Sequence, residues 1–294
     1  MNVPDFFIIG APKCGTTSLY MWLSGHPNIF MPQQKEPHYF NDDHRQRNIE
    51  CEHEYLALYR DRQPDHMAIG ESSAWYFYSR NAVTNILAYN RNARFIVCLR
   101  NPIDMALSLH GELLFSGYET LRNFDDAWAA QAERARGRGI PWLCPEPAFL
   151  QYGAVCSLGS QLRRLCEIAP RKAIVTIVLD DVVRDARAQY RRVLEFLGLA
   201  DDGRDSFAAA NVAKERRSCV LARAIEAGAA VKRALGITAR LSIVDRIEQA
   251  NRKPKPRPKI STEVRKKLAG YFAGDVALLS KLLSRDLSHW LQSA

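Results

Sequence analysis

The stretch FFIIGAPKCGTTSLY, residues 6–20, decides the fold. It begins with an apolar run typical of a buried strand, passes through a turn bounded by Gly10 and Gly15, and ends in hydroxyl residues that open a helix. A helix N-terminus leaves its first N–H groups without intrahelical partners and carries a partial positive charge, so it binds anions. Lys13 adds a full positive charge inside the turn. The sequence therefore predicts a phosphate-binding strand–turn–helix, with the helix running from about Thr16 to Gly25.

The position of the lysine separates this turn from the P-loop of nucleotide-triphosphate enzymes, G-x-x-x-x-G-K-[ST]. Gly10 and Gly15 have the P-loop spacing, but Thr16 stands where the P-loop has its lysine, and Lys13 lies two residues before Gly15. A kinase or other NTP-dependent enzyme is therefore an alternative that the sequence disfavours. The simplest alternative is an ordinary strand–turn–helix with a surface lysine.

The composition is that of a globular protein with a large core. Of the 294 residues, 47% are apolar and 25% are charged, and the net charge of +9 favours an anionic ligand. The same charge also fits simple solubility or a basic nucleic-acid-binding module, but no recognition motif for nucleic acid is present. We expect no nucleic-acid partner.

Targeting and redox signals indicate a cytoplasmic protein. No apolar run approaches the roughly 18 residues that span a membrane, and the N-terminus does not resemble a signal peptide. The seven cysteines form no C-x-x-C pair, so we expect reduced thiols and no metal site.

Strand-like and helix-like segments alternate along the first 200 residues. This order predicts an α/β fold with a doubly wound parallel sheet flanked by helices. Strands are expected at 6–10, 67–73, 94–99 and 173–179, and helices at 16–25, 79–90, 102–115, 123–136, 157–168 and 185–197.

The remainder of the chain, residues 201–294, is expected to be a helical extension without strands. Residues 206–250 are rich in alanine and basic residues and predict helix, and NRKPKPRPK at 251–259 predicts an extended basic loop. A final helix should begin with Ser261 or Thr262 as N-cap and end near Ser284, with Trp290 packed on the core. We expect a single domain over residues 1–294, with an α/β core over 1–200. The basic loop is either a cover for an anion or an exposed linker.

Two further places carry candidate site residues. Arg100 directly follows the strand 94–99, at the sheet edge where open α/β sheets bind ligands. Ser108 lies two turns along the next helix. The loop 31–41 interleaves Glu36 and His38 with aromatic residues. Such a loop is equally consistent with a site placed by a rigid scaffold and with a solvated loop whose aromatics pack on the core.

Together these motifs resemble a known family. PKCGTTS at 12–18 resembles the 5′-phosphosulfate loop of sulfotransferases that use 3′-phosphoadenosine 5′-phosphosulfate (PAPS), and RNP at 100–102 followed by Ser108 resembles their 3′-phosphate motif. ESS at 71–73, FLGL at 196–199 and DLSHW at 286–290 also look like bacterial members. The resemblance covers about residues 5–291. The resemblance is strongest to the branch that contains bacterial enzymes and the sulfotransferase domains of heparan sulfate synthesis. It implies a P-loop-like sheet.

The resemblance implies PAPS as the co-substrate and no metal. Lys13 would stabilise the charge that grows on the bridging oxygen, the loop would hold the phosphosulfate, and Arg100 with Ser108 would hold the 3′-phosphate. The basic segment would cover the adenosine end. The implied cofactor-binding residues are Lys13, Cys14, Gly15, Thr16, Thr17, Ser18, Arg100, Ser108, Arg252, Lys253 and Arg257.

The resemblance also suggests the base. Family members of this branch have a pattern like Glu-x-His-x-x-Asp, and Glu36, His38 and Asn41 stand at those places. Glu36 is the favoured base and should be partly desolvated, while His38 is the second candidate. The implied reaction moves a sulfuryl group to a hydroxyl or amine of a carbohydrate, lipid or small metabolite. The sequence indicates neither the acceptor nor the oligomeric state.

Overall fold

A parallel five-stranded sheet forms the centre of the protein. In the computed structural model, which describes residues 3–208, 214–216, 252–254 and 260–292, the strand order is β2-β3-β1-β4-β5. β1 pairs with β3 on one side and β4 on the other, and Phe6 lies opposite both Gly70 and Arg94. The predicted α/β class with a parallel sheet is confirmed. The strands are β1 Phe6–Gly10, β2 Ile29–Phe30, β3 Ala68–Ser72, β4 Arg94–Leu99 and β5 Ile174–Val178.

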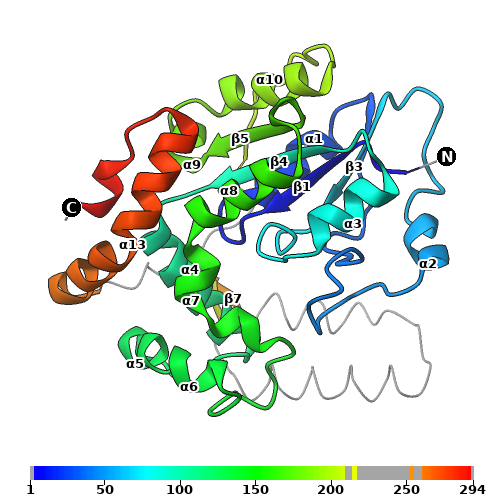
Figure 1. The fold of residues 1–294 in the computed structure, drawn as a ribbon. Helices are drawn as coiled ribbons and strands as arrows, with labels where there is room; N and C mark the ends of the chain where they lie inside the picture. The colour runs from blue at the N-terminus through cyan, green and yellow to red at the C-terminus, as the bar shows by residue number, and fades with distance from the viewer. Residues whose placement is uncertain (1–2, 209–213, 217–251, 255–259, 293–294) are drawn as a thin grey trace.

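Helices flank this sheet (Figure 1). α8 lies in front of the strands in that view and packs against α3 and the long helix α13, while α10 packs against β5. The helices are α1 Thr16–Ser24, α2 Glu52–Ala57, α3 Ala82–Tyr89, α4 Pro102–Ser116, α5 Phe124–Ala129, α6 Gln131–Ala135, α7 Tyr152–Cys156, α8 Leu158–Ile168, α9 Leu179–Arg184, α10 Ala186–Leu197 and α13 Thr262–Leu283, with 3-10 turns η1 Pro147–Leu150, η2 Arg171–Ala173 and η3 Ser288–Leu291.

Capping residues fix where the important helices begin. The Asn101 side chain accepts a hydrogen bond from Ile103 N–H (2.9 Å) at the start of α4, and Pro102 takes the first helical position. The Ser261 hydroxyl accepts a hydrogen bond from Val264 N–H (3.2 Å) at the start of α13. Of the two predicted N-cap residues, Ser261 is therefore the N-cap. α4 therefore starts directly after β4, at the same sheet edge as α1.

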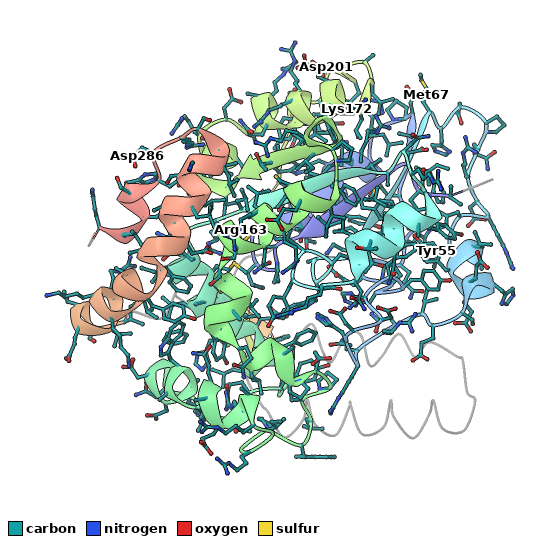
Figure 2. The ribbon with its side chains drawn as sticks, in the orientation of Figure 1. Tyr55, Met67, Arg163, Lys172, Asp201 and Asp286 are labelled. Atoms are coloured by element: carbon teal, nitrogen blue, oxygen red, sulfur yellow. The ribbon has the colours of Figure 1, made fainter. Side chains whose placement is uncertain are left out.

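The loop after β2 is anchored in the core by Phe40. Its ring lies 5.9 Å from Phe7 of β1 and 5.2 Å from Tyr55 of α2, between ring centroids. Tyr55, labelled in Figure 2, is fully buried. Burial of a large apolar side chain contributes about 1.5–3 kcal/mol. The predicted site loop is thus fixed at one end by core packing.

The C-terminal segment returns to the sheet, as the sequence predicts for Trp290. This side chain is buried, and its Nε1–H donates to Asp180 Oδ2 (2.7 Å). The backbone oxygen of Trp290 accepts from Asn101 Nδ2 (2.8 Å). The end of the chain therefore supports the turn between β4 and α4.

Two expectations about the secondary structure are wrong. The single helix expected at 123–136 is divided into α5 and α6 at Ala130. The expectation that strands stop after residue 200 fails because β6, Lys214–Arg216, pairs antiparallel with β7, Arg252–Pro254. Residues 206–208 are not helical, and the rest of the helix expected at 206–250 lies outside the described residues, apart from β6.

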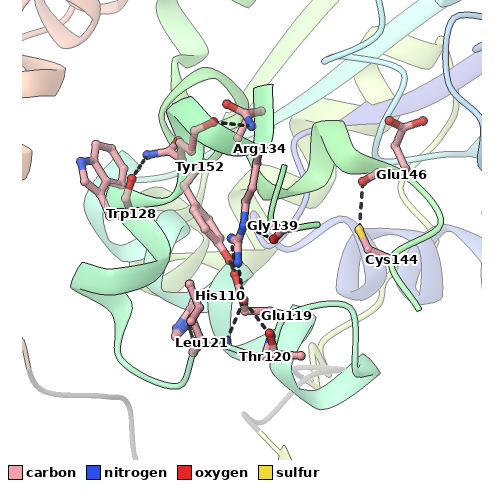
Figure 3. A network of polar contacts seen from close by, with 12 residues as sticks. His110, Glu119, Thr120, Leu121, Trp128, Arg134, Gly139, Cys144, Glu146 and Tyr152 are labelled. Carbon is pink, nitrogen blue, oxygen red and sulfur yellow. Dashed lines mark hydrogen bonds and ion pairs between the residues drawn. The ribbon is translucent and has the colours of Figure 1, made fainter. Parts of the chain in front are cut away.

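A buried ion pair holds the segment between α4 and α7 (Figure 3). Arg134 donates to both carboxylate oxygens of Glu119, at 2.6 and 2.8 Å, and Tyr152 OH donates to the same carboxylate at 2.8 Å. Burial by itself would raise the pKa of Glu119, but the hydrogen bonds from Arg134, Leu121 N–H and Tyr152 lower it below its ordinary value. This network braces the α5–α6 region and takes no part in the predicted site.

Candidate active site

The loop between β1 and α1 has the backbone shape that the sequence predicts. Gly10 has φ 147°, and a Cβ added there would lie 2.6 Å from Ala74 O, so the position requires glycine. Gly15 has φ 92° and directly precedes α1. Ala11 N–H donates to Cys98 O (2.8 Å), which ties the loop to the end of β4.

Lys13 and Arg100 meet at this loop although 87 residues separate them. Arg100 Nη1 donates to the backbone oxygen of Lys13 (3.0 Å), and the side chains of both residues are partly exposed. Two cationic side chains therefore stand beside the N-terminus of α1. This combination of charges and N–H groups is of the kind that suits an anion.

The Lys13 ammonium has a carboxylate partner on α4. Its Nζ lies 2.9 Å from Glu112 Oε2, and the exposed fractions of the two side chains are 22% and 48%. Ser108 is half-buried one turn earlier on α4, and residues i and i+4 share a helix face. Glu112 and Ser108 thus lie on the face of α4 that is turned toward the Lys13 loop.

The other loop residues divide into inward and outward ones. The Cys14 side chain is buried against Met105, with 3.7 Å between the sulfur atoms, and burial raises the pKa of its thiol strongly. The Cys14 N–H donates to Ala11 O (3.3 Å). Cys14 is therefore inert as a nucleophile. Thr16, Thr17 and Ser18 form the first turn of α1, with Thr16 buried and the other two half-buried.

Glu36 is held by three polar neighbours. Its Oε2 accepts from Ala74 N–H (2.7 Å) and lies 3.4 Å from His38 Nε2, while Oε1 contacts the ammonium of Lys35. Its side chain is 26% exposed. Glu36 is thus partly desolvated, as expected of a base, yet still reachable from solvent.

His38 is much less accessible than Glu36. The residue is 3% exposed, and its Nδ1 finds no hydrogen-bond partner among the described residues. Burial lowers the pKa of His38, although the nearby Glu36 carboxylate opposes this shift. His38 is therefore neutral at pH 7, with one ring nitrogen facing Glu36.

A fully buried carboxyl, that of Glu71, lies close to this loop. It is fully buried at the end of β3, where it accepts hydrogen bonds from Tyr55 OH (2.6 Å) and Ser73 Oγ (2.8 Å). Burial raises its pKa to about 7, while the hydrogen bonds from Tyr55, Ser73 and Tyr76 oppose this shift. Within the described residues, no cation is among the groups that most affect the pKa of this carboxyl.

Comparison with known proteins identifies the family that has this arrangement. Residues 3–216 match the sulfotransferase domain family. The chain belongs to the PAPS-dependent sulfotransferases. The match includes the strand–turn–helix of residues 6–20, the β4–α4 junction and the loop with Glu36.

Similar proteins come from animals and bacteria. The heparan sulfate glucosamine 3-O-sulfotransferases 3A1 and 3B1 of Mus musculus are each 27% identical over 202 residues, or 67% of this chain. The chain spans about half the length of these two relatives, 46% and 47%. The solved sulfotransferase of Alicyclobacillus acidocaldarius is 26% identical and superimposes with a TM-score of 0.73, covering 99% of both chains.

These findings confirm several predictions for this sulfotransferase. The family, the transferase class and the sheet flanked by helices with a helical C-terminal part are as the sequence indicates. The NTP-dependent enzyme and the nucleic-acid-binding module are not favoured. The structure brings Lys13 and Arg100 together, and it places Glu36 and His38 side by side.

The roles of the predicted site residues stay predictions, and three of the cofactor-binding residues are not described in full. Arg252 and Lys253 belong to β7, of whose side chains nothing is described, and Arg257 lies outside the described residues. Their contacts with the adenosine end stay predictions.

Three residues of the site escaped prediction. Lys35 and Glu112 are charged partners of Glu36 and Lys13, and Glu71 lies behind the loop. The i,i+4 spacing of Glu112 from Ser108 is a signal that could have identified it. Nothing in the sequence shows that Glu71 is buried or that Lys35 faces Glu36.

Within the described parts of the chain, no group of three or more His, Cys, Asp or Glu side chains is placed to hold a metal ion. None of the helices described is both long and apolar enough to cross a membrane.

Proposed function

We propose that this sulfotransferase moves the sulfuryl group of PAPS to an acceptor hydroxyl or amine. The observation that carries the proposal is the hydrogen bond from Arg100 to the backbone oxygen of Lys13 (3.0 Å), which unites two candidate phosphate sites. A co-substrate with a 5′-phosphosulfate and a 3′-phosphate requires two such sites. The donor set fits this ligand, because it consists of an ammonium, a guanidinium and the N-terminus of α1.

Each residue has a separate task in the proposal. Arg100 and Ser108 bind the 3′-phosphate, and the first turn of α1, Thr16–Ser18, holds the phosphosulfate through N–H and hydroxyl groups. Lys13 leaves Glu112 and donates to the oxygen that bridges phosphorus and sulfur. Arg252, Lys253 and Arg257 complete the site at the adenosine end.

Glu36 is the proposed base. As the acceptor oxygen or nitrogen bonds to sulfur, its proton passes to the Glu36 carboxylate, and the bond between sulfur and the bridging oxygen breaks with its electron pair left on the phosphate. Lys13 stabilises that charge, which is the main contribution a protein makes to group transfer of this kind. PAPS supplies the activated sulfuryl group. His38 orients Glu36 through the 3.4 Å contact, and its burial excludes it from direct contact with an acceptor.

The acceptor is proposed as a carbohydrate, a lipid or a small metabolite. The names of the mouse relatives refer to 3-O-sulfation of heparan sulfate glucosamine. This supports including glucosamine oligosaccharides among the candidate acceptors. We also propose a cytoplasmic bacterial enzyme that needs no metal. Six cysteines among the described residues are free thiols, which supports a reducing compartment.

Transfer of radiolabelled sulfate tests the proposal. The protein is incubated with sulfur-35 PAPS and separate panels of sugars, lipids, phenols and amines, with EDTA added to one set. We expect a labelled product from at least one panel and none from the Lys13→Ala variant. Labelled product from neither protein across all panels would contradict the proposed activity.

The NTP-dependent alternative has its own test. A thermal-shift series compares adenosine 3′,5′-bisphosphate with ATP–Mg²⁺. The proposal expects the larger rise in melting temperature with the bisphosphate, because the two phosphate sites lie on separate elements. A larger rise with ATP–Mg²⁺ would favour the alternative.

A further inference from the structure

The turn after β3 holds the loop that carries the proposed base. Ser72 O accepts from Glu36 N–H (2.9 Å), Ser73 Oγ accepts from His38 N–H (3.2 Å), and Ala74 N–H donates to the Glu36 carboxylate (2.7 Å). Glu36 and His38 have φ of 60° and 52°. Non-glycine residues adopt such backbone conformations at a cost of about 1–3 kcal/mol, and surrounding contacts must maintain them.

A second hydroxyl holds the next part of the same loop. Tyr76 OH accepts from Tyr39 N–H (2.9 Å) and Phe40 N–H (3.3 Å). Three consecutive N–H groups, those of residues 38–40, therefore donate to two side-chain hydroxyls. The loop conformation depends on where those hydroxyls lie and which way their own hydrogens point.

The hydroxyls of Ser73 and Tyr76 that hold the loop also form hydrogen bonds with the buried carboxyl of Glu71. Ser73 Oγ donates to Oε1 (2.8 Å), and Tyr55 OH donates to Oε2 (2.6 Å). Tyr76 is a further hydrogen-bonding partner of this carboxyl. The ionisable groups that face Glu71 are Tyr55 from α2, Tyr59 from the turn after α2, Tyr76 from the segment after β3, and Glu36 from the loop.

We propose that Glu71 is a positioning residue for sulfuryl transfer, whose ionised carboxylate locks residues 36–40 in the conformation that presents Glu36. An ionised carboxylate only accepts hydrogen bonds, so Ser73 must point its hydrogen at Glu71 and its lone pairs at His38 N–H. A protonated Glu71 donates one hydrogen, and one of its hydroxyl partners must then turn its own hydrogen elsewhere. The inference rests on the proposed function, because Glu36 matters only as the base.

The environment of Glu71 makes this lock respond to pH. Burial raises its pKa to about 7, so the carboxyl changes between its two forms near neutral pH. The loop is looser below pH 7 and locked above it. Glu71 therefore links the protonation of a buried carboxyl to the position of the base.

Hydrogen exchange of the loop tests this inference without any acceptor. Amide exchange of peptides covering residues 36–41 is measured at pH 6 and pH 8, corrected for intrinsic rates, in the wild type and in Glu71→Gln. Glutamine keeps the shape of a protonated carboxyl and cannot ionise. We expect wild-type protection to rise about threefold or more between the two pH values, roughly the contribution of one hydrogen bond. Protection in Glu71→Gln should stay at the lower value.

Controls separate positioning from general stability. Glu167→Gln, at an exposed carboxyl on α8, should behave as the wild type, and peptides from β4 should lose no protection in either variant. Adenosine 3′,5′-bisphosphate should bind Glu71→Gln within about twofold of the wild-type affinity. Equal loop protection in the wild type and Glu71→Gln at both pH values would overturn the inference. Loss of bisphosphate binding, or of protection in β4, would also overturn it.

A kinetic measurement connects the lock to turnover. Release of adenosine 3′,5′-bisphosphate from PAPS, with water as the acceptor, should fall about tenfold in Glu71→Gln at pH 8, because a misplaced catalytic group costs up to about a hundredfold. The wild-type rate should rise between pH 6 and pH 8, and that rise should be absent from the variant. An unchanged rate and pH profile would contradict the role of Glu71. If the wild type releases nothing with water or with any acceptor of the panels, the proposed function fails, while the exchange data still decide whether Glu71 holds the loop.

Discussion

The Nζ of Lys13 lies 2.9 Å from Glu112 Oε2, so the lysine proposed to neutralise the leaving group is paired with a carboxylate. Glu112 is 48% exposed, and an exposed pair of this kind contributes about 0–1 kcal/mol. The pair is therefore weak enough for an anionic ligand to displace it. Glu112 keeps the lysine near the loop and competes with the ligand for it.

Lys13→Ala should lower turnover at least about a hundredfold, which is the usual effect of removing one group that stabilises developing charge. The measurement is steady-state transfer of labelled sulfate under saturating PAPS. Lys172→Ala is the matched control, because Lys172 is exposed near the start of β5, far along the chain from the site residues (Figure 2). Turnover of Lys13→Ala close to that of the control would rule out the role given to Lys13.

Glu112→Gln should bind adenosine 3′,5′-bisphosphate up to about fivefold more tightly, since it removes the carboxylate that competes for Lys13. Calorimetry at constant ionic strength measures the change. In a Lys13→Ala background the same substitution should have little effect on affinity, because the competition no longer exists. An equal gain in both backgrounds would mean that Glu112 acts without Lys13.

Glu36→Gln should leave bisphosphate binding unchanged and abolish transfer, because it removes the proton acceptor and keeps the shape of the side chain. His38→Gln should retain some transfer, since the buried imidazole only orients Glu36. The comparison uses calorimetry and labelled-sulfate transfer on the same preparations. Transfer that survives in Glu36→Gln and disappears in His38→Gln would reverse the two roles.

The buried Glu71 should also affect stability. Its folded-state pKa is raised from 4.5 to about 7, so its contribution to stability is complete below pH 4.5 and is lost as pH rises to about 7. The loss amounts to about 3 kcal/mol at 1.36 kcal/mol per pKa unit. The free energy of unfolding of Glu71→Gln, relative to the wild type, should therefore increase over this pH window. The exposed Glu167→Gln serves as control, and a constant difference across the window would contradict the buried ionisation.

Local patterns in the sequence predicted most of the fold and the place where the proposed phosphate-binding residues meet. The apolar runs at 6–10 and 94–99 and the glycines of the first loop have direct backbone consequences, so the strand ends with Lys13 and Arg100 lie together as expected. The helix predicted at 123–136 divides at Ala130, where no proline or glycine marks a break. Local patterns in the sequence therefore give no sign of this division.

The partners of the site residues could not be predicted because they depend on tertiary contacts. Glu71 becomes important only when α2 brings Tyr55 against it, and Lys35 only when the loop turns its ammonium toward Glu36. The charged residues of a single sequence do not reveal which of them are buried. The different accessibility of Glu36 and His38, which supports Glu36 as the proposed base, likewise depends on tertiary contacts.

The affinity difference between adenosine 3′,5′-bisphosphate and adenosine 5′-monophosphate tests the central claim most directly, because it needs no acceptor. Calorimetry on the wild type should give at least about tenfold tighter binding of the bisphosphate, the contribution expected from an Arg–phosphate pair. In Arg100→Ala the two affinities should lie within about twofold of each other. Equal affinities in the wild type would contradict a 3′-phosphate site at Arg100, and with it the assignment of PAPS as the co-substrate.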